Sequence, residues 1–419
     1  MEVIIVAENA SARFGGEAIL PLHYFTKLKK RGFPVLMIVH ERVRNELAQD
    51  FPDLLHGVRF VSDSLLQKLL SRLGRGLPAR VRESTTDWMI TVLTAVRQRR
   101  IVKNLIGSGF GDVIHQPTPV SPKLPSFMYG FGKPVVIGPM NGGMEYPPAF
   151  KLHESFPTRL FVRFGRAAAN AVNFLIPGKR QAALLLCANE RTEAALPKGA
   201  SRNRKQLVEN GVDMALWSGD SAPGSIPTRT PVPTFLFMGR LVGWKSVDIL
   251  IEALARVVRQ TPVELKIVGA GPEMARLQTL ATSLKVAQYV EFLGFLPQSE
   301  CVKHVRTARA LVLPSLYECG GAVVLEAMCA SRPVIASDWG GPRDYLDTSS
   351  GFLVVPESRE YMIEAFASKM LLLALDADLA NQMGSAARLR AQMFFTWESK
   401  IDSIVECYES VVASVTKNF

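Results

Sequence analysis

Two basic side chains lie five positions apart in the stretch FLFMGRLVGWKS, residues 235–246. Its apolar start is typical of a strand, Gly239 marks a turn, and a helical pattern follows Lys245. Arg240 and Lys245 are therefore expected together at a strand end, where a planar guanidinium and an ammonium point charge can bind one diphosphate. The alternative interpretation is a pair of solvated cations beside a turn.

The same stretch departs from the P-loop, whose pattern is G-x-x-x-x-G-K-[ST]. Gly239 and Lys245-Ser246 have the required spacing, but Trp244 stands at the second glycine. A Cβ and an indole ring do not fit a loop that folds closely around phosphate. We therefore expect this stretch to hold phosphate without wrapping a triphosphate.

Two carboxylates follow in LPSLYECGGAVVLEAMCASRPVIAS, residues 313–337. Glu318 is expected in a turn after a strand, and Glu326 on the helix that begins after the turn. Each can accept hydrogen bonds from vicinal hydroxyls, while the free N–H groups at the helix start suit phosphate or sugar oxygens. The alternative is a helix-terminal carboxylate and a buried structural Glu. The expected ligand-facing residues of the turn are Gly320, Gly321, Ala322 and Val323.

A third glycine turn occurs in IVGAGPEMARL, where Gly269 and Gly271 follow an apolar run. The dinucleotide fingerprint requires a third glycine, but Met274 stands there and no acidic residue ends the next strand. The pattern therefore disfavours a dehydrogenase. We assign Gly269 and Gly271, with Gly239, to backbone that approaches a ligand closely; a simple turn is the alternative.

These turns need a scaffold, and the chain of 419 residues is too long for a single core. Apolar runs such as VIIV and TFLFM alternate with amphipathic helical patterns, which favours parallel sheets covered on both faces. Residues 218–233 are rich in Ser, Gly and Pro and are expected to be a linker. We predict an α/β protein of two doubly wound domains, residues 1–217 and 218–397, with a terminal helix at 398–419 on the first.

The paired motifs resemble the retaining glycosyltransferases of family 4, which have the GT-B fold of two Rossmann-like domains facing a central cleft. Glu318 and Glu326 match the E-x7-E motif of that family, and Arg240 and Lys245 match its R-x4-K pair. The resemblance implies that Glu318 contacts the donor sugar, Glu326 the nucleotide ribose, and the basic pair the diphosphate. ENGVD at 209–213 and SDWGGPRDYL at 337–346 also resemble family segments.

The N-terminal half matches the family more loosely. ARFGGEA resembles its glycine-rich loop and implies that Gly15 and Gly16 face the donor. DVIHQPTP resembles a strand end with a histidine near the reacting centre, so that His115 would orient the acceptor; a structural histidine is the alternative. GPMNGGMEYPP resembles a loop on the acceptor side of the cleft. Its expected acceptor residues are Asn141, Gly142 and Gly143.

The resemblance implies transfer of a sugar from a UDP- or GDP-linked donor to a hydroxyl acceptor, in polysaccharide or glycolipid biosynthesis. Arg240 and Lys245 can stabilise the leaving diphosphate, so neither a metal nor a cofactor is expected. Ser246 and Cys319 replace the usual family residues, so the donor sugar is not carried over. The rivals are a nucleotide-sugar epimerase or phosphorylase, and a non-catalytic nucleotide-sugar or lipid-binding module.

The net charge of +11 is uneven, because residues 1–217 hold 30 basic and 17 acidic side chains. Basic and apolar residues alternate at 68–103 and 156–180, which favours binding to anionic lipid over nucleic acid; an amphipathic core helix is the alternative. We expect a carbohydrate or lipid-linked acceptor. With no signal peptide and no apolar run of membrane-spanning length, the expected location is the cytoplasm, peripheral on the inner membrane face.

Overall fold

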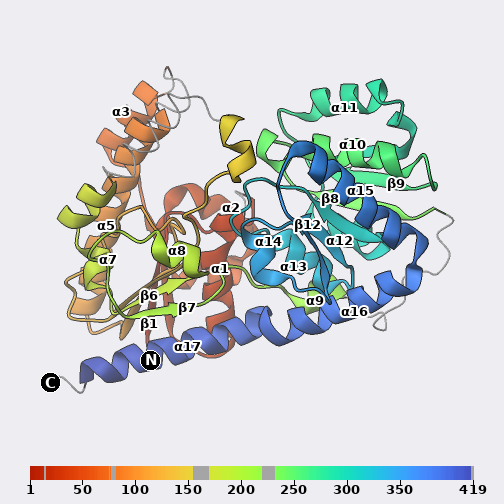
Figure 1. The fold of residues 1–419 in the computed structure, drawn as a ribbon. Helices are drawn as coiled ribbons and strands as arrows, with labels where there is room; N and C mark the ends of the chain where they lie inside the picture. Colours follow the sequence, from red (N-terminus) through yellow and green to blue (C-terminus); the bar gives the residue numbers. More distant parts are fainter. Residues whose placement is uncertain (14–15, 75, 77–81, 154–168, 219–231, 417–419) are drawn as a thin grey trace. The chain divides into compact units, whose positions relative to one another are not determined.

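The computed structural model describes residues 1–13, 16–74, 76, 82–153, 169–218 and 232–416 (Figure 1). The chain divides into two compact units. Unit 1 comprises Met1–Gly143, Pro157–Glu209 and Lys400–Phe419, and unit 2 comprises Met144–Phe156 and Asn210–Ser399. Compared with the expected domain of residues 1–217, two short segments thus belong to unit 2. The expected linker falls almost wholly on residues 219–231, outside the described residues.

Seven parallel strands form the sheet of unit 1, in the order β3-β2-β1-β4-β5-β6-β7. The order reverses between β1 and β4, which defines the switch point of a doubly wound sheet. The strands are β1 (Val3–Val6), β2 (Val35–His40), β3 (Val58–Val61), β4 (Val113–Gln116), β5 (Val135–Met140), β6 (Leu184–Cys187) and β7 (Arg204–Gln206). The helices are α1 (Gly16–Lys30), α2 (Arg44–Asp50), α3 (Leu65–Gly74), α5 (Trp88–Gly107), α7 (Gly178–Gln181), α8 (Glu190–Ala194) and α17 (Trp397–Thr416), the last of which enters unit 1 at Lys400.

Six parallel strands form the sheet of unit 2, in the order β10-β9-β8-β11-β12-β13. They are β8 (Thr234–Met238), β9 (Glu264–Val268), β10 (Val290–Gly294), β11 (Ala310–Leu313), β12 (Val334–Ser337) and β13 (Gly351–Val354). The helices are α9 (Met214–Ser218), α10 (Val247–Val257), α11 (Met274–Ser283), α12 (Gln298–Thr307), α13 (Ala322–Cys329), α14 (Gly341–Tyr345), α15 (Arg359–Leu375) and α16 (Ala377–Phe394). Within this unit α10 packs against α15, and α13 against α16.

The central strands are apolar throughout because helices cover both faces of each sheet (Figure 1). All four side chains of β1 and of β11 are buried, and so are those of β12. Side chains alternate between the two faces of a strand, so burial of every residue requires a layer on each side. Two parallel, doubly wound sheets with helices on both faces are thereby confirmed.

His115 lies on β4 in the core of unit 1 and is fully buried. Its Nε2 is 2.6 Å from the carbonyl oxygen of Gly138, and its Nδ1 is 2.6 Å from the hydroxyl of Tyr408 on α17. A carbonyl only accepts, so Nε2 carries the proton and Nδ1 accepts from Tyr408. With both ring nitrogens bonded and no solvent exposure, His115 is a structural residue, and its predicted catalytic role is wrong.

The protonation of His115 gives a testable pH dependence. Burial lowers the pKa of His115 to about 4, whereas a histidine in an unfolded chain has a pKa of about 6.5. Acid therefore protonates the unfolded chain first, and stability is lost as the pH falls from about 6.5 to about 4. At about 1.4 kcal/mol per pKa unit, the loss from this residue is about 3 kcal/mol.

We expect urea unfolding, followed by circular dichroism, to show a steeper loss of stability between pH 7 and pH 5 in the native chain than in His115→Gln. The variant is less stable at pH 7, because it disturbs the bonds to Gly138 and Tyr408, but it lacks the titrating group. Equal pH slopes for the two chains would contradict this assignment.

Candidate functional site

Most predicted residues of unit 2 lie on, or directly after, two loops at the carboxyl edge of its sheet. Loop A, residues 239–246, joins β8 to α10, and loop B, residues 314–321, joins β11 to α13. β8 and β11 are hydrogen-bonded neighbours, so the two loops start side by side. Leu316 of loop B donates its N–H to the carbonyl oxygen of Trp244 in loop A at 2.9 Å. Two segments whose paired residues Lys245 and Glu318 are 73 positions apart in sequence thus form one continuous edge.

An ion pair joins the two loops. Lys245 Nζ donates a hydrogen bond to Glu318 Oε2, and the two side chains are only 14% and 12% exposed. A pair so withdrawn from water interacts more strongly than a surface pair, and removing one partner leaves a charge in a poorly solvated place. The structure therefore brings together two residues that the sequence placed in separate motifs.

Loop A also carries Arg240 and Trp244, whose side chains are exposed. Ser246, at φ 50° and ψ 40°, turns the chain from the short helical turn Gly243–Lys245 into α10. A serine therefore occupies a left-handed backbone position that favours glycine. Arg240 and Lys245 lie at opposite ends of the loop. The edge is therefore bordered by one exposed cation, Arg240, and by one largely buried, paired cation, Lys245.

The start of α13 lies directly after loop B. Gly321 is its N-cap, with φ 74° in the left-handed region, and no side chain caps the helix. Ala322 and Val323 open the helix and are partly exposed. Backbone N–H groups at a helix start with no capping side chain attract anions. This arrangement sets a helix end with uncapped N–H groups beside the Lys245–Glu318 pair.

Glu326 lies one turn into α13, and part of its side chain remains accessible to solvent. Burial of the carboxyl group raises the pKa of Glu326 to about 7, while a hydrogen bond with Gln298 acts in the opposite direction. The carboxyl group therefore titrates near neutral pH. The two carboxylates differ in environment, because Glu318 is paired with Lys245, whereas Glu326 has no ion-pair partner within the described residues.

Glycines set the backbone of this edge by close packing. Leu241 of loop A donates its N–H to the carbonyl oxygen of Ala270 at 3.0 Å. A Cβ on Gly269 would overlap the carbonyl oxygen of Gly239, and one on Gly271 would overlap that of Leu241. Gly269 and Gly271 thus let the turn after β9 cross loop A at backbone distance. This crossing explains why both residues are glycines. It agrees with the alternative interpretation from the sequence, in which they only form a turn.

A second glycine pair supports loop B and was missed as a site feature. Gly341 donates its N–H to the carbonyl oxygen of Glu318 at 2.7 Å. A Cβ on Gly340 would overlap that same oxygen, and one on Gly341 would overlap the carbonyl oxygen of Gly320. The signal was present in the sequence as the adjacent glycines of SDWGGPRDYL. These two residues position the Glu318 backbone.

The remaining predicted residues lie in unit 1. Gly16 opens α1 and is exposed, whereas Gly15 falls outside the described residues. Asn141 is buried, and Gly142 donates its N–H to the Thr192 hydroxyl at 3.1 Å. A Cβ on Gly143 would lie 2.6 Å from that of Ala195. Asn141 also donates its N–H to the carbonyl oxygen of Val120 at 2.8 Å, so the loop after β5 is anchored both by α8 and by the segment after β4.

Within the described ranges, no group of three or more His, Cys, Asp or Glu side chains is arranged to hold a metal ion. The chain has a D-x-D triplet at Asp376–Asp378, but Asp376 accepts the N–H of Leu379 at 2.8 Å and caps α16. All five cysteines are free thiols. In the described part of the chain, no helix is both long enough and apolar enough to span a bilayer.

Comparison with known proteins relates the chain to glycosyltransferases. Residues 222–390 match the family model described as glycosyl transferases group 1. The chain is 33% identical over 224 residues to the D-inositol 3-phosphate glycosyltransferase of Geodermatophilus obscurus, covering 50% of this chain and 48% of that protein. It is 29% identical over 204 residues to a glycogen synthase of Mycobacterium tuberculosis, covering 48% and 47%. The chain therefore spans about half the length of the curated relatives it matches.

Solved structures extend the likeness to the whole fold. HepE of Anabaena, in complex with UDP, superposes with a TM-score of 0.65 at 18% identity, covering 98% of this chain and 100% of that one. The sucrose-phosphate synthase of Thermosynechococcus elongatus gives a TM-score of 0.64 at 17% identity, covering 98% and 99%. The chain thus shares its two-unit fold with these proteins, and residues 222–390, which hold loops A and B, match glycosyl transferases group 1.

Proposed function

We propose that the chain is a retaining, metal-independent glycosyltransferase of the family 4 kind. It moves a sugar from a UDP- or GDP-linked donor to a hydroxyl of a carbohydrate or lipid-linked acceptor, in polysaccharide or glycolipid biosynthesis. The observation that carries the proposal is the Lys245–Glu318 ion pair beside the uncapped start of α13. The match of residues 222–390 to glycosyl transferases group 1 and the UDP complex of HepE support the donor class.

The chemistry asks for stabilisation of the leaving group. As the bond between sugar C1 and the phosphate oxygen breaks, negative charge grows on the diphosphate. Lys245, Arg240 and the N–H groups at the start of α13 are the positive groups at this edge that can stabilise this charge. Before the donor arrives, Glu318 neutralises Lys245, so the site does not hold an unpaired cation in poorly solvated surroundings.

The acceptor proton needs a destination. His115 is buried and fully bonded, so it does not serve as the base. In front-face attack, the acceptor hydroxyl bonds to C1 on the side from which the diphosphate leaves, and its proton passes to the departing phosphate oxygen. That route retains the configuration at C1 and uses no enzyme nucleophile. Glu318 then contacts the donor sugar, and Glu326 contacts the ribose hydroxyls.

The rival functions share the donor site and differ in product. An epimerase would release free nucleotide from the donor without an acceptor, and a binding module would leave the donor intact. Incubation with UDP-sugars and GDP-sugars, with and without acceptors, separates all three by product analysis. We favour transfer because residues 222–390 match glycosyl transferases group 1.

Replacing Lys245 tests the diphosphate contact. We expect Lys245→Ala to lower turnover of a saturating donor by about 10²–10³, the usual effect of losing one charge-stabilising donor. The matched control is Lys303→Ala, which removes a lysine from a surface ion pair with Glu300 on α12. Turnover of Lys245→Ala within threefold of the Lys303→Ala value, with folding intact by circular dichroism, would refute the contact.

The titration of Glu326 predicts how nucleotide affinity depends on pH. The ionised carboxylate is the stronger acceptor for ribose hydroxyls, and with a pKa of about 7 its ionised fraction rises steeply between pH 6 and pH 8. Calorimetry should show tighter UDP binding at pH 8 than at pH 6. Glu326→Gln should bind more weakly at pH 8 and lose that part of the pH dependence. An unchanged affinity and slope in the variant would remove the ribose role.

We also propose that unit 1 binds the inner face of the cytoplasmic membrane from the cytoplasm. The four leucines of what we call the α3 patch are exposed by 49–86%: Leu65, Leu66, Leu69 and Leu73. Lys68 and Arg72 are exposed on the same helix. Leucines with interleaved cations fit the interface of an anionic bilayer, and the basic balance of residues 1–217 adds attraction.

Flotation with vesicles that contain phosphatidylglycerol tests the α3 patch. The native chain should float with them at low salt and less so at 0.5 M salt, because salt screens the charges. Leu65→Ser/Leu69→Ser should reduce flotation at least fivefold. The control is Leu372→Ser/Leu375→Ser, which changes two exposed leucines of unit 2. Equal flotation of both variants would exclude the patch, and no flotation of the native chain would exclude membrane binding.

A further inference from the structure

A cavity of about 490 Å³ lies wholly within unit 1. Its wall includes Glu8 and Asn9, just after β1, and Gln116 and Thr118, at and after the end of β4. β1 and β4 are the pair between which the strand order reverses, and ligands of doubly wound sheets bind beyond the carboxyl ends at that point. The volume falls within the usual range for small-molecule sites.

The wall carries hydrogen-bond acceptors in an arrangement suited to hydroxyl groups. Three carboxylates line it: Glu8, Glu17 and Asp87. Among the described residues that line the cavity, none is Lys or Arg. Loss of solvent and the nearby Glu8 raise the pKa of Glu17, although the N–H of Val120 opposes this by donating to its Oε1 at 2.9 Å. An anion entering this cavity would meet charges of its own sign.

Arginines outside the lining already balance two of these carboxylates, so the ligand need not carry a positive charge. Arg42 lies 3.5 Å from Glu8, and Arg82 lies 3.4 Å from Asp87, and neither arginine is among the lining residues. Partly neutralised in this way, the carboxylates remain acceptors for neutral donors. Asn9 adds a buried amide oxygen with no hydrogen-bond partner among the described residues. A buried acceptor without a donor is costly, and a ligand hydroxyl would satisfy it.

The apolar part of the wall offers a flat surface. Trp88, at the start of α5, is 39% exposed and lines the cavity, together with Phe127, Leu124 and Pro125. An indole face packs well against the apolar face of a ring. A sugar ring has two kinds of surface. Its hydroxyls can donate to the hydrogen-bond acceptors on one part of the wall, and its C–H face can pack against the indole on the other.

We infer that this cavity binds an uncharged sugar ring of the acceptor, stacked on Trp88 and hydrogen-bonded by Glu17 and Asp87, and that it rejects phosphorylated rings. The assignment of the ring to the acceptor rests on the proposed glycosyl transfer, whereas binding of the ring by unit 1 does not. The residues concerned differ from Asn141, Gly142 and Gly143, which the sequence assigned to the acceptor. Specificity here comes from repulsion of the wrong ligand as well as from contacts with the right one.

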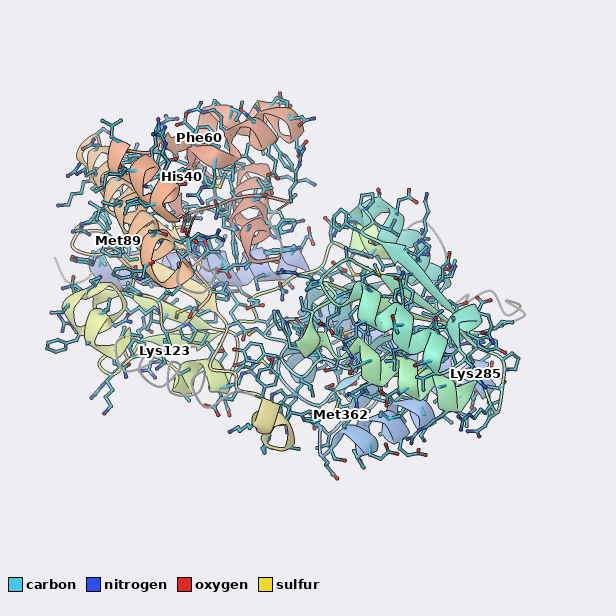
Figure 2. The ribbon with its side chains drawn as sticks, turned by 90° about the horizontal axis from the view of Figure 1, so that it is seen from above. His40, Phe60, Met89, Lys123, Lys285 and Met362 are labelled. Atoms are coloured by element: carbon cyan, nitrogen blue, oxygen red, sulfur yellow. The ribbon has the colours of Figure 1, made fainter. Side chains whose placement is uncertain are left out.

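Ligand-observed NMR titrations of the full chain test the inference. The probes are methyl hexosides and neutral disaccharides, and the corresponding hexose 6-phosphates. We expect at least one neutral glycoside to bind saturably, and at least tenfold more tightly than its phosphorylated counterpart. Trp88→Ala should weaken that binding at least tenfold. The matched control is Met89→Ala, the next residue on α5, labelled in Figure 2, which does not line the cavity and should change it less than twofold.

A charge-neutralising variant tests the exclusion of phosphate separately. Glu17→Gln/Asp87→Asn should reduce the discrimination against hexose 6-phosphates at least fivefold. The inference is overturned if no neutral glycoside of the panel binds, if a hexose 6-phosphate binds more tightly, or if the Trp88 and Met89 variants behave alike. UDP binding, measured on the same samples, reports on unit 2. If the native chain binds a glycoside but not UDP, the proposed donor site is refuted and the cavity assignment stands.

Discussion

The ion pair between Lys245 and Glu318 is the interaction on which the candidate site depends. Both side chains are largely withdrawn from water, so each charge is tolerable only because the other is present. The pair connects two loops that follow neighbouring strands, and the bond between Leu316 and Trp244 fixes their backbones beside it. A diphosphate that enters such a site meets a cation already in place, at the start of a helix whose N–H groups no side chain caps.

The glycines around the pair allow close approach of backbone segments to one another. Gly269 and Gly271 let one turn cross loop A, and Gly340 and Gly341 let another press on loop B. Each would place a Cβ on a carbonyl oxygen if it were replaced by another residue. Close packing of four loops at one sheet edge thus keeps Lys245 and Glu318 within ion-pair distance. Preorganisation of this kind is what electrostatic catalysis requires.

Much of the fold was predictable because parallel strands buried on both faces are continuous apolar runs. The runs VIIV, TFLFM and ALVL became β1, β8 and β11. In contrast, β7 reads Arg-Lys-Gln and is exposed, and only pairing with β6 makes it a strand. The assignment of residues 144–156 to unit 2 depends on contacts such as that of Trp339 with the carbonyl oxygen of Glu145, 194 positions away, which no local pattern shows.

The site was predictable as far as its motifs were local. The spacings from Arg240 to Lys245 and from Glu318 to Glu326 indicated a strand-end site, but their approach across 73 residues required the sheet order. His115 failed as a prediction because its partner Tyr408 lies 293 positions away, and a histidine at a strand end has the same local pattern whether it is buried or exposed. The acidic cavity of unit 1 was not predicted, since its carboxylates lie on segments separated by other elements.

The central claim is that loops A and B hold a diphosphate through Lys245. Calorimetric titration of UDP and UMP into the native chain and into Lys245→Ala tests it directly, because the two ligands differ by the second phosphate alone. A hydrogen bond to a charged group contributes about 1.5–3 kcal/mol, so UDP should bind about ten- to a hundredfold more tightly than UMP to the native chain. That advantage should largely disappear in the variant. Equal affinities of UDP and UMP for the native chain, or an undiminished advantage in Lys245→Ala, would contradict the account.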